Sequence, residues 1–107
     1  GDLTWHPFIN TPPYPDYSSG ANNVTRALTK TLALFFHKNH FTFQYTSNNP
    51  AAVPPTRTYT RFSDLSDDVV EVRILQGIHF RTACDDGTVL GKAVAQYVLE
   101  NAFQSQR

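Results

Sequence analysis

Two short stretches combine polar side chains with a glycine at the edge of a predicted helix, and both are suited to holding an anion. The first is Ser18-Ser19-Gly20-Ala21, which directly precedes a helical pattern. Backbone N–H groups at a helix start lack intrahelical acceptors, and the helix dipole favours negative charge there. The Ser19 hydroxyl adds a further donor. The plainer alternative is that Ser19 and Gly20 form only a cap and a turn.

The second stretch, residues 73–81, places Arg73 near the end of a predicted helix and His79 six residues later, beyond Gly77. A guanidinium group offers two parallel charged donors to a tetrahedral oxyanion. A neutral imidazole can attack phosphorus or coordinate a metal oxyanion. Such a pair could hold phosphate or vanadate. The plainer alternative is that Arg73 pairs with Glu71 or Asp68 and that His79 is a hydrogen-bonded core histidine.

The periodicity of apolar residues predicts the elements that carry these side chains. A helix is expected from Ala21 until the 37–40 stretch, with Ser18 or Ser19 as its N-cap, and a second helix from Ser63 until Gly77. A third helix is expected after a capping turn at residues 85–87. Alternation predicts strands at 41–46 and 57–60, which would form a short hairpin at best.

The first twenty residues hold four of the seven prolines and show no apolar period. They are expected to form an extended arm that is anchored by aromatic side chains, namely Trp5, Phe8, Tyr14 and Tyr17. We therefore divide the chain into an arm at residues 1–20 and a helical segment at residues 21–107.

Composition excludes several classes of function. The 107 residues include 9 Lys+Arg and 9 Asp+Glu, so the zero net charge gives no diffuse attraction to nucleic acid or to an anionic membrane. The single cysteine, Cys84, cannot form an internal disulfide, and its acidic neighbours disfavour a reactive thiolate. No apolar run is long enough for a membrane span, so we expect a soluble chain, exported or not.

Longer motifs resemble the C-terminal half of vanadium-dependent haloperoxidases, which share a superfamily with type 2 phosphatidic acid phosphatases and class A acid phosphatases. The similarity runs in order along nearly the whole chain. It is carried by Trp5-x-Pro7, by residues 11–20 (TPPYPDYSSG), by residues 57–63 (RTYTRFS), by Arg73-x-x-x-Gly77-Ile78-His79-Phe80-Arg81, and by Gly91-x-x-Val94-x-x-Tyr97-Val98.

The resemblance implies a fold, a ligand and a set of site residues. It implies an all-α helical bundle, here three amphipathic helices with the arm and a short hairpin, as part of a larger bundle. Arg73 matches the arginine that grips the oxyanion, and His79 the histidine that bonds to vanadium or attacks phosphorus. Ser19 and the Gly20 N–H match the serine-glycine donors. Vanadate is the implied cofactor, and peroxidase or hydrolase activity the implied chemistry.

Three departures from the family pattern bear on activity. Ala21 replaces the acid/base histidine of the family's Ser-Gly-His motif, a group typically worth about 10²- to 10⁴-fold in rate. Asn22, Asn23 and His6 are candidate substitutes. Ala83 stands where the family has an aspartate that steadies the histidine. The family's Lys-x6-Arg-Pro motif does not occur before Trp5.

These departures lead to two hypotheses and to an expectation about partners. We expect an N-terminal half, on a separate or cleaved chain, or a homodimer, since one arginine and one histidine leave much of a trianion's charge unmatched. With that half, the domain would be haloperoxidase- or phosphatase-like, and alone it would be inactive because Ala21 supplies no acid or base. The alternative is a non-enzymatic binding or assembly module of the same fold.

Overall fold

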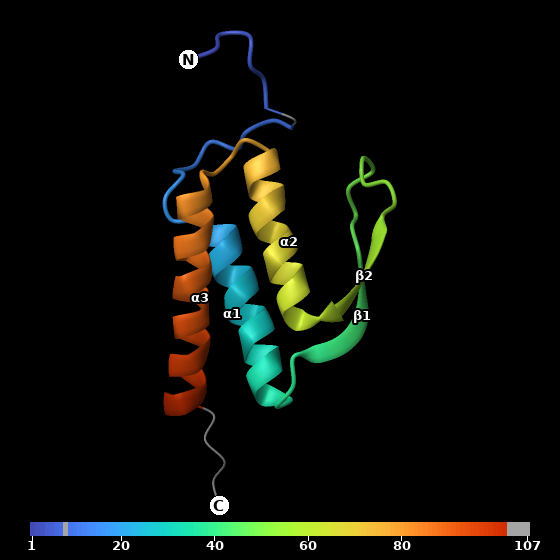
Figure 1. Cartoon of the computed structure of the whole chain (residues 1–107), viewed down its shortest axis with the longest axis vertical. Helices are drawn as coiled ribbons and strands as arrows, with labels where there is room; N and C mark the ends of the chain where they lie inside the picture. The colour runs from blue at the N-terminus through green and yellow to red at the C-terminus, as the bar shows by residue number, and fades with distance from the viewer. Residues whose placement is uncertain (8, 103–107) are drawn as a thin grey trace, which may run out of the picture.

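The computed structural model describes residues 1–7 and 9–102. Its elements follow the order α1 (Gly20–Phe35), β1 (His40–Thr46), β2 (Thr56–Arg61), α2 (Phe62–Leu75) and α3 (Arg81–Asn101). The three helices lie side by side, with α2 antiparallel to α1 and α3 (Figure 1). The starts of α1 and α3 and the end of α2 therefore meet at one end of the bundle, beneath the N-terminal arm.

The expectation of an all-α fold is wrong, because β1 and β2 form a two-stranded antiparallel sheet beside α2 (Figure 1). Phe43 pairs with Tyr59 in the register, and their rings stack with centroids 5.4 Å apart. The buried ring of Phe62, the first residue of α2, stacks on Phe41 at 5.4 Å. Aromatic and threonine pairs favour extended strands, and this cluster fastens the sheet to α2.

The helix boundaries confirm two expectations and correct a third. Ser19 is the N-cap of α1, and Gly77 follows the end of α2 with φ +67°, a conformation that suits glycine. The predicted capping turn at residues 85–87 is wrong, because α3 begins at Arg81. At this start the Phe80 carbonyl accepts the N–H groups of Ala83 and Cys84 at 3.1 and 3.3 Å, and the Ser19 N–H donates to the Ala83 carbonyl at 3.0 Å.

Small residues bring α1 and α3 into close contact. The buried positions of α3 are Ala83, Cys84, Gly87, Gly91 and Ala95. A Cβ atom added at Gly87 would lie 2.5 Å from the Ser19 carbonyl oxygen, and one at Gly91 would overlap the Asn23 carbonyl oxygen. The backbones thus touch where side chains would otherwise separate them.

The larger apolar side chains of α1 and α3 are mostly exposed. Val24 and Phe35 on α1 are 69% and 68% exposed, and Tyr97 on α3 is 68% exposed. The apolar periodicity therefore predicts the helices correctly but does not mark the contact between them, which uses small and polar positions instead.

Three of the four aromatic anchors of the arm can be placed. The Trp5 ring lies against Gly77, and the Tyr14 ring lies 5.9 Å from that of His79. The Tyr17 hydroxyl lies near Asp86, whose carboxylate raises the pKa of Tyr17. Phe8 lies outside the described residues. The arm thus crosses the end of the bundle where α2 stops and α3 starts (Figure 1).

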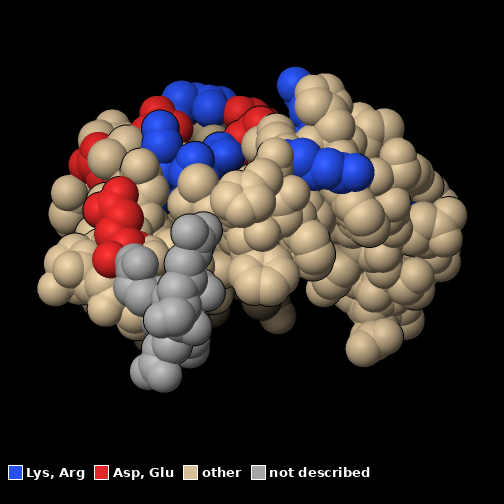
Figure 2. Space-filling model, turned by 90° about the horizontal axis from the view of Figure 1, so that it is seen from below, with Lys and Arg blue, Asp and Glu red and all other residues tan. Residues whose placement is uncertain are grey.

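The distribution of charged side chains on the surface is consistent with the zero net charge of the chain. In the view from below, basic and acidic side chains alternate over one part of the face, and much of the rest carries neither (Figure 2). Within residues 1–7 and 9–102, no helix has the length and apolar character that crossing a bilayer requires.

Candidate functional site

The four residues singled out as an oxyanion site lie at the same end of the bundle. Ser19 and Gly20 are at the start of α1, Arg73 is in the last turn of α2, and His79 is in the connection to α3. The arm residue Tyr14 lies between the last two, since its ring centroid is 5.7 Å from the Arg73 guanidinium carbon and 5.9 Å from the His79 ring. The positive ends of the α1 and α3 dipoles add to the Arg73 charge there.

His79 is buried and held by one carboxylate. Its side chain is 1% exposed, and Nδ1 lies 3.0 Å from Oδ1 of Asp16 in the arm. The same oxygen accepts the Phe80 N–H at 3.0 Å. Since a carboxylate only accepts, this hydrogen bond places a proton on Nδ1, and in the neutral form of the ring the lone pair is then on Nε2. Nε2 is buried and has no hydrogen-bond partner in the described structure.

Arg73 is half-buried and lacks a carboxylate partner among the described residues. Its Nη1 donates to Gln76 Oε1 at 3.3 Å, and its Nε is buried without a partner. The plainer alternative for Arg73 is wrong, because Glu71 pairs with Arg81 at 2.8 Å and Asp68 with Arg57 at 2.9 Å. Burial lowers the pKa of Arg73 from its ordinary value, but a guanidinium remains charged at neutral pH.

Ser19 and Asn22 form a buried pair at the start of α1. The Ser19 hydroxyl donates to Asn22 Oδ1 at 2.6 Å, and both residues are 0% exposed. Asn22 Nδ2 is a third buried donor without a partner. Beside this pair, Gly20 and Ala21 line a hollow of about 480 Å³ together with Tyr14 and Tyr17. The first backbone N–H groups of α1 lie at this hollow.

Cys84, in the first turn of α3, lies near several residues of the candidate site, and they affect the pKa of its thiol. Burial raises the pKa of the Cys84 thiol, a hydrogen bond to Ser19 opposes that shift, and the charges of Asp16 and Arg73 act on it with opposite sign. Since all three reach one thiol, Ser19, Asp16 and Arg73 belong to one neighbourhood. No group of three His, Cys, Asp or Glu side chains suited to a metal ion occurs in the described part of the chain.

The Cys84 thiol is expected to be inert in the folded protein. It is 0% exposed and its pKa is raised, so a thiol reagent such as DTNB should react at least about 100-fold more slowly than in concentrated urea. The measurement is the rate of thionitrobenzoate release under both conditions. Equal rates would show that this turn of α3 is open.

Comparisons with known proteins identify the fold. A family model described as the VCPO second helical-bundle domain matches residues 1–106. The chain belongs to this family. The resemblance to vanadium-dependent haloperoxidases is thereby confirmed, and the sheet beside α2 is part of a domain that the family describes as a helical bundle.

Solved structures agree with the family assignment. The first bacterial vanadium-dependent iodoperoxidase is 30% identical over 90% of this chain, with a TM-score of 0.76. Holo-type and apo-type bacterial vanadium-dependent chloroperoxidases, at 17% and 19% identity, share the fold with TM-scores of 0.74 and 0.71. This chain spans 23% of each of these structures. No curated protein sequence matches it.

Sequence reasoning missed one residue of the candidate site, and the chemistry of an amide limits the role of another. Asp16 lies in the Pro15-Asp16-Tyr17 run of the motif that ends at Ser19, but only the folded arm shows that it reaches His79. Asn22 is a candidate substitute for the acid/base histidine, yet its amide does not titrate, so it can donate and accept hydrogen bonds but cannot transfer a proton.

Proposed function

We propose that this end of the bundle binds a tetrahedral oxyanion, vanadate or phosphate, between Arg73, His79 and the start of α1. The observation that carries the proposal is the set of buried polar atoms without partners at one end of the fold: His79 Nε2, Arg73 Nε and Asn22 Nδ2. Unpaired buried polar atoms cost free energy. The Arg73 and Asn22 N–H groups would donate to oxygens of a bound oxyanion, and the His79 Nε2 lone pair would coordinate vanadium or attack phosphorus. The residues present therefore fit the group that the family implies.

Asp16 is the residue that prepares His79 for this role. By accepting a hydrogen bond from Nδ1–H, it fixes the tautomer whose Nε2 lone pair is free to coordinate vanadium or to attack phosphorus. It also accepts the Phe80 N–H, which holds the connection between α2 and α3 in place. We propose that Asp16 does here what the family's later aspartate does elsewhere, since Ala83 stands at that position.

The other residues of the site would supply charge and hydrogen bonds. Arg73 contributes the positive charge, and Gly20 and Ala21 contribute backbone donors at the α1 terminus. The Ser19 hydroxyl can donate to the oxyanion once it releases Asn22 Oδ1. When bound, vanadate supplies Lewis acidity toward hydrogen peroxide, the basis of halide oxidation. Further positive charge would come from an N-terminal half or from a second copy of the chain.

The presence of Ala21 supports a second candidate function, that of a domain that binds the oxyanion with slow turnover or none. The methyl group of Ala21 lines the hollow where the family places an acid/base imidazole, and it cannot transfer a proton. A domain that binds the oxyanion but turns over slowly, or only binds, is consistent with this substitution. Assays of halide oxidation with vanadate and peroxide, and of aryl phosphate hydrolysis, would separate the enzyme from the binding module.

Arg73→Ala is expected to weaken orthovanadate binding at least about tenfold, because it removes the charged donor from a half-buried position. The measurement is isothermal titration calorimetry on the complete polypeptide that contains these residues. Arg57→Ala is the matched control, since Arg57 lies on β2 and pairs with Asp68. Absence of vanadate binding by the unsubstituted polypeptide would overturn the proposed function.

A further inference from the structure

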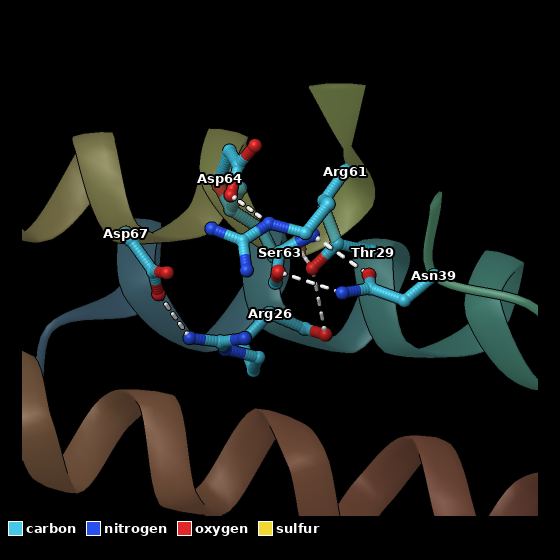
Figure 3. A network of polar contacts seen from close by, with 8 residues as sticks. Arg26, Thr29, Asn39, Arg61, Ser63, Asp64 and Asp67 are labelled. Carbon is cyan, nitrogen blue, oxygen red and sulfur yellow. Dashed lines mark hydrogen bonds and ion pairs between the residues drawn. The ribbon is translucent and has the colours of Figure 1, made fainter. Parts of the chain in front are cut away.

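A groove on another part of the molecule is lined by residues of α1, α2 and α3 and by Asn39 of the connection between α1 and β1. It has a volume of about 510 Å³. Its residues come from the middle of α1, the beginning of α2 and the middle of α3, whereas the proposed oxyanion site uses the opposite end of α2 and the first turns of α1 and α3. Figure 3 shows part of its lining, with Arg26, Thr29, Asn39 and Ser63 labelled and α3 across from them.

The charge of this groove is positive. Arg26, Lys30 and Lys92 line it, and no Asp or Glu does so among the described residues. Arg26 pairs with Asp67 of α2 at 2.6 Å, where the Asp67 side chain is 62% exposed (Figure 3). Neither lysine forms an ion pair within residues 1–7 and 9–102. Two positive charges therefore face the groove without a counter-charge.

Other polar groups of the groove can also donate hydrogen bonds. Arg26 Nε and Thr88 Oγ1 are buried and have no hydrogen-bond partner in the described structure. Ser63 Oγ accepts the Asn39 amide at 2.9 Å, which leaves its own proton available (Figure 3). Since the unpaired Arg26 Nε and Thr88 hydroxyl can both donate and the unmatched charges are positive, the complementary ligand is an anion rich in acceptors.

We propose that the groove between α1, α2 and α3 binds a small organic anion that carries a phosphate group or several carboxylates. Two unmatched lysines suit a ligand with two or more negative charges. A volume of about 510 Å³ exceeds what a bare phosphate needs, and Ala33 and Val89 give the groove an apolar part for an organic moiety. The site is independent of His79 and of the proposed vanadate chemistry.

The test uses the complete polypeptide with His79→Ala, so that the oxyanion site does not contribute to the signal. Phenyl phosphate and citrate are titrated separately by calorimetry, which distinguishes a phosphate from a carboxylate ligand. The double variant Lys30→Gln/Lys92→Gln is expected to weaken binding of the preferred probe at least about tenfold. The matched control is Lys38→Gln, because Lys38 lies beyond the end of α1 and outside the groove. Circular dichroism checks that each variant is folded.

Three results would overturn the inference. The first is the absence of binding of either probe to the complete polypeptide. The second is equal binding by the double lysine variant and by the Lys38 control. The third is binding by residues 1–107 alone but not by the complete polypeptide, because another segment of the protein would then fill the groove. None of these results bears on vanadate binding, which the His79→Ala background removes.

Discussion

His79→Ala is expected to weaken orthovanadate binding by at least about a hundredfold, or ~2.7 kcal/mol. The substitution removes His79 Nε2, a buried ring nitrogen that has no hydrogen-bond partner among the described residues. Calorimetry on the complete polypeptide measures the change. His40→Ala is the matched control, because His40 is exposed at the start of β1. Equal affinity of the His79→Ala variant and the unsubstituted protein would place the oxyanion elsewhere.

Variants of Asp16 test whether the orientation and tautomer of the His79 ring matter for vanadate binding, because they leave the imidazole itself in place. Asp16→Ala removes the acceptor for Nδ1 and is expected to lower vanadate affinity about tenfold. Asp16→Asn keeps a carbonyl oxygen that can accept the same proton, so its affinity should lie between those of Asp16→Ala and the unsubstituted protein. If Asp16→Asn and Asp16→Ala bind equally weakly, the charge of the carboxylate rather than the tautomer decides the affinity.

Gly91→Val is expected to lower the free energy of unfolding by about 3 kcal/mol or more, or to prevent folding. A Cβ at this position would overlap the Asn23 carbonyl oxygen and approach the Ala27 nitrogen at 3.0 Å, so α1 and α3 must separate. Separation would also pull Ser19 away from the Ala83 carbonyl. Urea denaturation followed by circular dichroism measures the loss.

The matched control for stability is Gly20→Ala. A Cβ at Gly20 meets no atom within 4 Å, and Gly20 is the first residue of α1. Alanine also favours a helix, so this variant should be within about 1 kcal/mol of the unsubstituted protein or more stable. If Gly91→Val is as stable as Gly20→Ala, the close contact of α1 with α3 is not what holds the bundle together.

Local signals predicted the parts of the site that depend on local structure. Ser19 precedes an apolar period and caps α1, and Gly77 has the positive φ that a helix end uses, so Arg73 and His79 were placed on the correct elements. These features could be predicted because caps and turns are determined within a few residues.

Features that depend on tertiary contacts could not be predicted in the same way. Asp16 reaches His79 across 63 residues of sequence, and nothing in its immediate neighbours reveals that contact. α3 starts at Arg81, where the N-cap Phe80 has no capping side chain and donates its N–H to Asp16 of the arm, so the acidic turn at residues 85–87 was mistaken for a cap. The all-α expectation failed because the aromatic cluster around Phe62 stabilises a sheet that short strands alone would not.

The most direct test of the central claim is the ¹⁵N NMR spectrum of the His79 imidazole in the complete polypeptide, before and after addition of orthovanadate. His79→Ala assigns the signals. The account predicts a proton on Nδ1 and a free lone pair on Nε2 before addition, and a large shift of the Nε2 signal on binding. Vanadate that binds while the Nε2 signal stays unchanged would contradict the assignment of His79 as its ligand.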